Sequence, residues 1–423
     1  MQETRYICNG NCDRCKFTRG SEYCNTGAQE SRFAHKIDRI LTNRLLGLPI
    51  LLVVLLVIFE LTFTVGAYPQ AWIESGVDAL AQLVHSLDGP IWLTSLLADG
   101  VIRGCGAVIS FLPNIIILFF FLSLLEDSGY MARAAFLMDK LMHAVGLHGN
   151  SFIPMLVGFG CNVPAIMAAK GIGNLKDRRL TMLMIPFMSC SARLPVYLLF
   201  VSAFFPRHKA LVMISLYVIG IALSIIFAFI MKRTRYFRKS NADDIFTLPP
   251  LRRPDGKMLW EHIWDRCKDY LQKITTVILA ASVIIWALEF FPMQDGGSAA
   301  RDESCLARIG QWMEPVTAPL GFDWKMNVCI LTGLPAKEAI VSTMGILYHS
   351  EDESSLASAL QQSGGFSPAT AFGFMVFVLL YFPCIATVKT LRKEIGRKWA
   401  VFAVANSLLL AWVVAFLIAH IFG

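Results

Sequence analysis

The chain has 423 residues, of which 55% are hydrophobic and 16% are charged. This composition excludes an ordinary soluble enzyme and is typical of a protein that crosses a membrane several times. A formal net charge of +7 would also suit a nucleic-acid-binding protein, but the Lys and Arg residues lie in loops between apolar segments. We therefore interpret them as charges that hold these loops in the cytosol, and we expect no nucleic-acid partner.

Residues 1–44 are mostly polar and precede the first apolar segment, so we expect no cleaved signal peptide. They contain four cysteines, Cys8, Cys12, Cys15 and Cys24. The close pair Cys12 and Cys15 resembles zinc and redox sites, although the full spacing fits no standard ligand set. A metal-binding or iron-sensing site is one interpretation of this segment, and a reduced, unstructured tail is the simpler one.

Residues 45–67 and 108–125 are the first two predicted membrane crossings, because each is apolar and long enough to span about 30 Å of hydrocarbon. The basic residues just before the first crossing place the N-terminus in the cytosol. The connection 68–98 is rich in acidic residues, and we expect it outside.

Residues 152–169 carry no charge but contain three helix breakers, Gly158, Gly160 and Pro164. If this segment crossed the membrane, the loop 232–257, with eight Lys or Arg against three Asp, would lie outside. That arrangement would oppose the usual excess of Lys and Arg in cytosolic loops. We therefore predict a re-entrant hairpin that enters and leaves on the cytosolic side.

A second interrupted segment, residues 326–348, is broken by Gly333 and Pro335 and predicts a hairpin from the opposite side. The remaining predicted crossings are residues 180–205, 211–231, 274–288, 369–388 and 401–423. The expected fold class is an all-α membrane protein with about seven spanning helices and two re-entrant hairpins in an inverted repeat. Such a repeat places the substrate near the middle of the membrane, where the two halves meet.

Two short sequence echoes accompany the predicted repeat: Val163-Pro-Ala165 with Leu334-Pro-Ala336, and Cys190-Ser-Ala192 with Cys384-Ile-Ala386. We divide the chain into an N-terminal segment (1–44), the first crossing with its external connection (45–98), the first repeat with the following helix (99–231), a basic cytosolic linker (232–257), the second repeat (258–392) and a C-terminal helix (393–423). Residues 99–106 and 261–273 look amphipathic, and we expect them to lie in the membrane interface.

Two cysteines stand among helix breakers within apolar sequence, in Gly158-Phe-Gly-Cys-Asn-Val-Pro164 and in Pro186-Phe-Met-Ser-Cys-Ser-Ala-Arg-Leu-Pro195. A broken helix frees backbone groups, and each unsatisfied group in hydrocarbon costs several kcal/mol. Such breaks persist where they line a cavity, as in many transporters. We predict Cys161, Cys190 and Cys384 as sulfur ligands of a transported metal ion. For any single cysteine, the alternative is a small buried hydrophobic residue.

Oxygen ligands are predicted next to these cysteines and in the second hairpin. Asn162 and Ser191 either bind the ion or cap the broken helix ends. Glu338 should be paired or functional, because an acid near the membrane centre costs about 2.5–3.5 kcal/mol. Its neighbour Lys337 offers an internal salt link as the alternative.

Two further acids end the second crossing. Glu126 and Asp127 could attract the cation on the cytosolic side, and an ion pair with Arg133 is the alternative. Glu60 lies within the first crossing, and we assign it no role.

Motifs in a fixed order resemble the membrane part of the ferrous iron transport protein B (FeoB) family. Besides the two cysteine motifs they are Lys36-Ile-Asp-Arg-Ile40, Leu46-Gly-Leu-Pro49, Ser110-Phe-Leu-Pro-Asn114, Leu125-Glu-Asp-Ser-Gly-Tyr-Met-Ala-Arg-Ala-Ala-Phe136, Ser151-Phe-Ile-Pro154, Gly333-Leu-Pro-Ala-Lys-Glu338, Pro383-Cys-Ile-Ala-Thr387 and Gly396-Arg-Lys-Trp-Ala400. The resemblance implies two gate repeats, a core like that of concentrative nucleoside transporters, and Fe²⁺ as the transported substrate with no tightly bound cofactor. It also implies a multi-pass protein of the bacterial inner membrane, in contact with lipid.

The family usually begins with a GTP-binding domain, and here the chain departs from it. The pair Gly256-Lys257 lacks the glycine spacing of a phosphate-binding loop, so we expect no nucleotide-binding or catalytic residues and no enzyme activity. A separate GTP-binding subunit and a small FeoA-like protein are the partners that the resemblance implies, and a homo-oligomer is left open.

Two alternatives to iron transport remain from the sequence. One is a carrier of nucleosides or other organic solutes that shares the gate fold. The other is an iron-responsive regulatory subunit that senses iron through its N-terminal cysteines and transports nothing.

Overall fold

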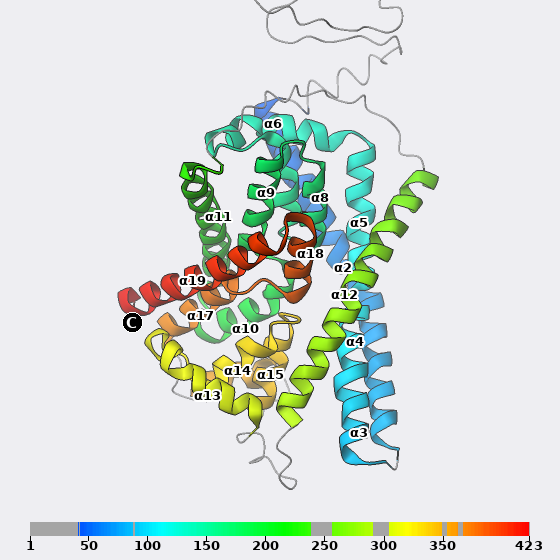
Figure 1. Cartoon of the computed structure of the whole chain (residues 1–423), viewed down its shortest axis with the longest axis vertical. Helices are drawn as coiled ribbons and strands as arrows, with labels where there is room; N and C mark the ends of the chain where they lie inside the picture. The colour runs from blue at the N-terminus through cyan, green and yellow to red at the C-terminus, as the bar shows by residue number, and fades with distance from the viewer. Residues whose placement is uncertain are drawn as a thin grey trace, which may run out of the picture.

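The structure, a computed structural model, describes residues 41, 43–87, 89–237, 256–290, 304–348, 353–362 and 367–422. All regular secondary structure in these ranges is helical, which confirms the predicted all-α class (Figure 1). The four N-terminal cysteines and residues 238–255 of the basic linker lie outside the described residues.

Three long helical stretches run side by side along one edge of the molecule (Figure 1). One is α2 (Arg44–His85), and another is α12 (Gly256–Phe290). Between them runs a column made of α3 (Ile91–Ser95), the π-helical segment η1 (Leu96–Ile102), α4 (Arg103–Ser110) and α5 (Leu112–Asp127). The chain then bends by 80° at Gly129, which has a positive φ of 77°, into α6 (Tyr130–Ala144).

The first repeat contains two broken elements. The short helices α7 (Phe152–Val157) and α8 (Asn162–Ala168) flank the break 158–161, and α9 (Leu175–Met184) and α10 (Leu194–Phe204) flank the break 185–193. Single turns of 3₁₀-helix lie around them: η2 (Gly149–Ser151), η3 (Ala169–Gly171), η4 (Ile185–Phe187) and η5 (Ser191–Arg193). The helix α11 (Lys209–Arg233) follows without a break.

The second repeat has the same order of broken elements. After α13 (Cys305–Thr317) and η7 (Ala318–Leu320), the break 333–338 separates α14 (Trp324–Thr332) from α15 (Ala339–Leu347). After α16 (Glu353–Gln362), the break 381–384 separates α17 (Pro368–Leu380) from α18 (Ile385–Ile395), and α19 (Arg397–Phe422) ends the described chain. The glycines and prolines of the sequence therefore locate all four breaks.

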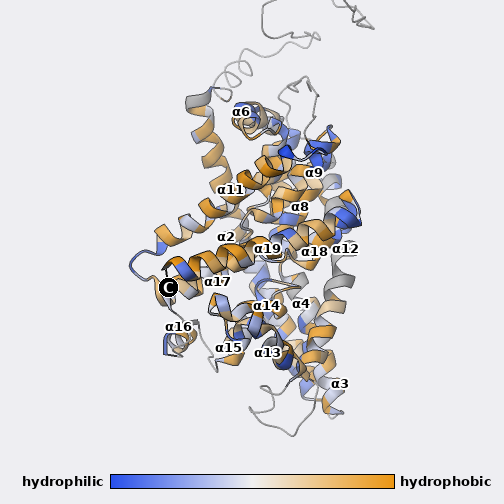
Figure 2. Ribbon diagram, turned by 60° about the vertical axis from the view of Figure 1, so that its left-hand side comes forward, coloured by the Kyte–Doolittle hydropathy of each residue, from blue (hydrophilic) through white to orange (hydrophobic). Residues whose placement is uncertain are grey.

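Five helical stretches within the described ranges are long and apolar enough to cross a membrane, and a sixth is added if α5 and α6 form one bent span. The five are Leu46–His85, Leu175–Phe204, Lys209–Arg233, Pro368–Ile395 and Arg397–Ile421. Hydrophobic residues cover α11, α17 and α19 in Figure 2. The protein is therefore a multi-pass membrane protein, and the count of seven crossings stays a prediction.

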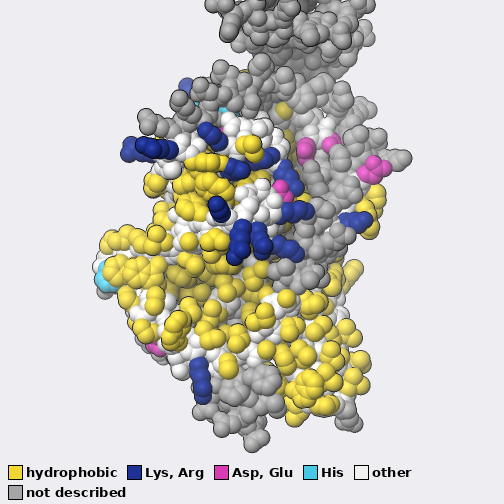
Figure 3. Space-filling model, in the orientation of Figure 1, with side chains coloured by type: hydrophobic (Ala, Val, Ile, Leu, Met, Phe, Trp, Pro, Cys, Tyr) yellow, Lys and Arg dark blue, Asp and Glu magenta, His cyan; other side chains and the backbone are white. Residues whose placement is uncertain are grey.

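Lys and Arg side chains gather toward one end of the molecule, while hydrophobic side chains cover most of the rest of the visible face (Figure 3). Two basic segments, 170–179 and 389–398, meet through an ion pair of 2.9 Å between Lys170 and Glu394. Charge counting places both segments in the cytosol, and their contact agrees with a common side.

The structure differs from two expectations about helices, namely where the first helix ends and whether two interfacial helices are separate. The connection expected from residue 68 onward is helical as far as His85, and Gln70 donates a hydrogen bond of 2.8 Å to Glu74 one turn later in α2. Residues 99–106 and 261–273 do not form separate interfacial helices, because they belong to the central column and to α12. Gly100 and Gly104 face α12 and allow the close approach of helices that small residues permit in membranes.

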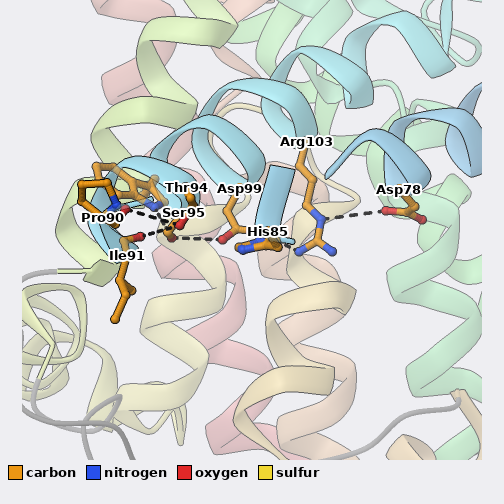
Figure 4. Close-up of polar contacts among 9 residues, drawn as sticks. Asp78, His85, Pro90, Ile91, Thr94, Ser95, Asp99 and Arg103 are labelled. Carbon is orange, nitrogen blue, oxygen red and sulfur yellow. Dashed lines mark hydrogen bonds and ion pairs between the residues drawn. The ribbon is translucent and has the colours of Figure 1, made fainter. Parts of the chain in front are cut away.

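A polar cluster explains how the acids assigned to an external loop are accommodated in helices (Figure 4). Asp99, in η1, accepts hydrogen bonds from Ser95 Oγ at 3.0 Å and Arg103 Nη1 at 2.9 Å. His85 Nε2 of α2 lies 3.4 Å from the same carboxylate. Trp286 of α12 donates to Ser95 Oγ at 2.9 Å, so the cluster links all three helical stretches.

Close packing between α2 and α4 gives a first prediction. A Cβ atom at Gly106 would overlap the stiff, β-branched side chain of Val77, whereas one at Gly76 would meet nothing within 4 Å. We expect Gly106→Ala to destabilise the protein by about 1–3 kcal/mol through overpacking. The measurement is the thermal unfolding midpoint of the purified protein in detergent. Gly76→Ala is the matched control and should be neutral, and equal midpoints for the two variants would contradict the close contact between the helices.

Candidate functional site

The four helix breaks meet around one cavity of about 140 Å³. Each break places one candidate ligand at the start of the helix that follows it. Cys161 precedes α8, Cys190 precedes η5, Glu338 precedes α15 and Cys384 precedes α18, and all four line the cavity. Residues far apart in the sequence are thus brought together because the chain is broken at equivalent places in both halves.

Backbone hydrogen bonds join the two breaks within each repeat. In the first repeat, Ser191 donates to the Gly160 carbonyl through its backbone N–H at 3.2 Å and through its hydroxyl at 3.0 Å. In the second, the Ile385 N–H donates to the Leu334 carbonyl at 3.2 Å. In both cases the donor directly follows a cysteine of the cavity, which is structural support for the repeat.

This pairing corrects the register of one predicted sequence echo. The echo pairs residues 163–165 with 334–336, but the bonds make Gly160 equivalent to Leu334. That register instead aligns Ala165-Ile166 with Ala339-Ile340, within the second helix of each hairpin. The echo arises because both hairpins contain Pro-Ala. In the register set by the hydrogen bonds, Pro164 aligns with Glu338, three residues after Pro335.

Two buried basic side chains donate hydrogen bonds to carbonyl groups that the breaks leave free. Arg193 donates to the Met188 carbonyl at 3.0 Å and to the Pro186 carbonyl at 3.4 Å. Lys337 donates to the Phe382 carbonyl at 2.8 Å, and its ammonium group lies 3.1 Å from the ring centroid of Tyr381. Charge-assisted hydrogen bonds of this kind are among the stronger ones in proteins.

The alternative for Glu338, a salt link with Lys337, is not observed, since the ion pairs among the described residues do not include these two. The reason is geometric, because the lysine reaches back to the carbonyl of the neighbouring break. The carboxylate of Glu338 therefore lines the cavity without that lysine as its ion-pair partner.

Six of the eight predicted ligands line this cavity: Cys161, Asn162, Cys190, Ser191, Glu338 and Cys384. Asn162 is buried, and its Oδ1 accepts no hydrogen bond from the described part of the chain. The α8 start has no side-chain cap, so the alternative of Asn162 as a cap is not observed. Cys384 Sγ lies 3.1 Å from Thr387 Oγ1.

The other two predicted ligands lie elsewhere. Glu126, near the end of α5, lines a second cavity of about 460 Å³ between α5, α6 and the first hairpin. Asp127 is the last residue of α5 and lines neither cavity. Glu60, to which we assigned no role, is exposed on α2 and accepts a hydrogen bond from Thr64 at 3.2 Å.

A polar wall of the cavity lies outside the four helix breaks and was not predicted from the sequence. Asn114 of α5 and Thr62 of α2 both line it and are buried. Asn114 donates to Gln70 at 2.7 Å, and its Oδ1 accepts no bond within the described ranges. The sequence feature that could have indicated Asn114 is an amide within the apolar run 108–125, because a polar group in hydrocarbon is costly unless it has a partner or a function.

The cavity combines three thiols, one carboxylate and two amide oxygens that accept no hydrogen bond within the described ranges. Such a mixture of soft and hard donors suits a transition-metal ion more than an alkali or alkaline-earth ion. Its volume of about 140 Å³ lies below the roughly 300–1,000 Å³ usual for pockets that hold organic ligands.

Family models and curated relatives agree with this architecture. A gate model described as "Nucleoside recognition" matches residues 108–204 and 271–398, and a model described as "Ferrous iron transport protein B C terminus" matches residues 213–266. The chain belongs to the ferrous iron transport protein B family. The gate matches cover all four helix breaks. No solved structure matches the chain.

Similar family members come from distant organisms. A Porphyromonas gingivalis protein named "Fe(2+) transport protein A/Fe(2+) transporter FeoB fusion protein" is 44% identical over 94% of this chain and 53% of its own length. Proteins named "Fe(2+) transporter FeoB" from Staphylococcus aureus strain COL and Methanocaldococcus jannaschii are 42% and 40% identical, over 92% and 91% of this chain. The chain spans 60% and 58% of these two relatives.

The carbonyl contacts of Arg193 give a second prediction. Arg193→Met keeps much of the side-chain volume but leaves the Pro186 and Met188 carbonyls without this donor. We expect the loss to destabilise the protein by about 1–3 kcal/mol per orphaned group. The readout is thermal unfolding in detergent, with the exposed Arg308→Met as the matched control. A midpoint for Arg193→Met at or above that of the unchanged protein would show that the carbonyls do not depend on the guanidinium.

Proposed function

We propose that this chain carries ferrous iron across the bacterial inner membrane, as the permease part of a FeoB-like system. The observation that supports it most is the convergence of three cysteines and one glutamate from four helix breaks on a single cavity. The names of the relatives add iron as the specific ion, which cavity geometry alone does not select.

The ion meets a site with opposing charges. The positive ends of the helices that begin at the breaks lie at the cavity, and the guanidinium of Arg193 adds a further positive group. A bare cation would be repelled unless sulfur and carboxylate ligands carry negative charge. The balance yields weak binding, which a transporter needs in order to release its ion. Fe²⁺ also stands low in the general affinity order of divalent metals.

Access from the two sides requires the repeats to move relative to each other. The bonds Ser191–Gly160 and Ile385–Leu334 each lie within one repeat, so each pair of breaks moves as a unit. The ion pair Lys170–Glu394, in contrast, joins the first repeat to the end of α18, the helix that follows the last break, on the side with the basic segments. In this mechanism it opens when the cavity is exposed to the cytosol.

The chain itself supplies the path, and other polypeptides supply regulation. We infer that it does not hydrolyse nucleotide, and that a separate GTP-binding subunit and a small FeoA-like protein act with it. The Porphyromonas gingivalis relative, whose name joins protein A and FeoB, supports the second partner.

The cysteine path gives a third prediction. Cys161→Ser, Cys190→Ser and Cys384→Ser should each lower Fe²⁺ uptake into liposomes roughly tenfold, the effect of losing about 1.4 kcal/mol of interaction with the ion. The assay is anaerobic uptake read by an enclosed fluorescent chelator, normalised to the protein reconstituted. Cys105→Ser and Cys305→Ser are matched controls, because neither residue lines the cavity. If all three cavity variants keep normal uptake, the thiols do not take part in transport.

A fourth prediction concerns the carboxylate and separates the two transport hypotheses. Glu338→Gln keeps the side-chain shape but removes the negative charge, so Fe²⁺ uptake should fall by roughly tenfold or more.

The gate model's description as "Nucleoside recognition" favours an organic-solute carrier as the second candidate. Uptake of labelled uridine is therefore measured in the same liposomes. Uridine uptake that needs no metal, together with absent Fe²⁺ uptake, would decide for that candidate.

A further inference from the structure

A second group of metal-binding side chains lies outside the central cavity, on α6 and the turn that follows it. One ligand atom each from Asp139, His143 and His148 lies within 4.8 Å of the other two. None of the three lines the central cavity. In Figure 1, α6 crosses the end of the molecule at which the basic side chains of Figure 3 gather.

Local sequence explains why these side chains meet. Asp139 and His143 are four residues apart on α6 and therefore share one face of the helix. Gly146, with φ of +80°, ends the helix, and the Leu147 N–H donates back to the Met142 carbonyl at 2.8 Å. This reversal returns His148 to the helix, and the rings of His143 and His148 lie 5.3 Å apart in an edge-to-face arrangement.

Outer contacts hold the three side chains in place. The Gly149 N–H donates to Asp139 Oδ1 at 2.8 Å. His143 Nδ1 lies 3.0 Å from the Leu147 carbonyl, and His148 Nε2 lies 3.5 Å from the carboxylate of Asp177. His143 Nδ1 also lies 3.7 Å from Asp139 Oδ1. Metal-binding histidines typically have one ring nitrogen against a carbonyl or carboxylate, as His148 does, and this contact orients the ring for the metal.

The buried carboxylate of Asp177 is itself neutralised. Lys232 Nζ lies 3.1 Å from Asp177 Oδ1, which ties α9 to α11 behind the histidines. Asp177 therefore acts as an anchor for His148, whereas Asp139 is the carboxylate that faces the two rings.

We propose that Asp139, His143 and His148 form a binding site for a divalent first-row transition-metal ion. Two imidazoles and one carboxylate are a set that binds Fe(II) with open positions for water. Ligands about 2.0–2.2 Å from a metal stand about 3 Å apart, so the three side chains need to close by less than about 2 Å. The side chain of His143 is 55% exposed, and this open side admits ions from solution.

This site goes beyond the proposed transport function and does not depend on it. It concerns ion binding to the folded chain at a place separate from the cavity at the helix breaks. It would remain if the central cavity carried a different solute.

A cobalt titration tests the site on the purified full chain in detergent. Co(II) is the probe, because its visible absorption reports the ligands around it. We expect the unchanged protein to bind one Co(II) more than the double variant His143→Gln/His148→Gln, or to bind it at least roughly tenfold more tightly. Asp139→Asn keeps the acceptor for Gly149 but should also weaken binding. Absorption from cobalt–thiolate bonds should be the same in the unchanged protein, the double histidine variant and Asp139→Asn.

The matched control is His208→Gln/His420→Gln, which removes two exposed histidines elsewhere and should leave the titration unchanged. The titration is repeated with Cys161, Cys190 and Cys384 all changed to Ser, so that a failure of the central site is seen separately. Identical cobalt stoichiometry and affinity in the unchanged protein and the His143→Gln/His148→Gln variant would overturn the proposal.

Discussion

The structure depends on how the backbone groups freed by four helix breaks are satisfied without water. In hydrocarbon each orphaned group costs several kcal/mol, so a broken helix needs partners supplied by the protein. Here the partners are of two kinds. Each hairpin carbonyl, of Gly160 or Leu334, accepts the N–H that follows a cavity cysteine. The carbonyls of Pro186 and Phe382 accept from Arg193 and Lys337. Because these bonds fix the breaks, they also fix the cysteines, and the cavity geometry follows from backbone chemistry.

The side chains that satisfy the freed carbonyl groups also set the electrostatics of the cavity. Cationic side chains are effective donors to several carbonyls at once, but they bring positive charge to a place proposed to receive a cation. The positive helix ends act in the same direction. In the proposed function, glutamate and thiol ligands would balance this field, and we infer that such a site releases its ion again.

The four breaks, three of which carry a cavity cysteine, could be predicted from sequence, because Gly and Pro in apolar runs have a direct backbone consequence. Their convergence also followed from the predicted inverted repeat. The partner of Lys337 could not be predicted, since the choice between Glu338 and the Phe382 carbonyl depends on tertiary geometry. The length of α2 was missed because Asp78 and the other acids suggested an external loop, yet Arg103 pairs with Asp78 at 3.8 Å. Asn114 was missed because one amide in an apolar run carries little signal.

The distribution of bonds also indicates where the protein can move. The backbone bonds that join the paired breaks lie within one repeat, and so do the carbonyl contacts of Arg193 and Lys337. Between repeats, the contacts include apolar ring packing, such as Phe200 against Phe374 with centroids 5.0 Å apart. Packed apolar surfaces can slide by small steps, whereas the bonds within a repeat would have to break. We infer that the easiest motion is a shear of one repeat against the other, and that such a shear separates ligands of different repeats. Cys161 and Cys190 would then move away from Cys384 and Glu338, so the motion that opens the cavity would also weaken the hold on the ion.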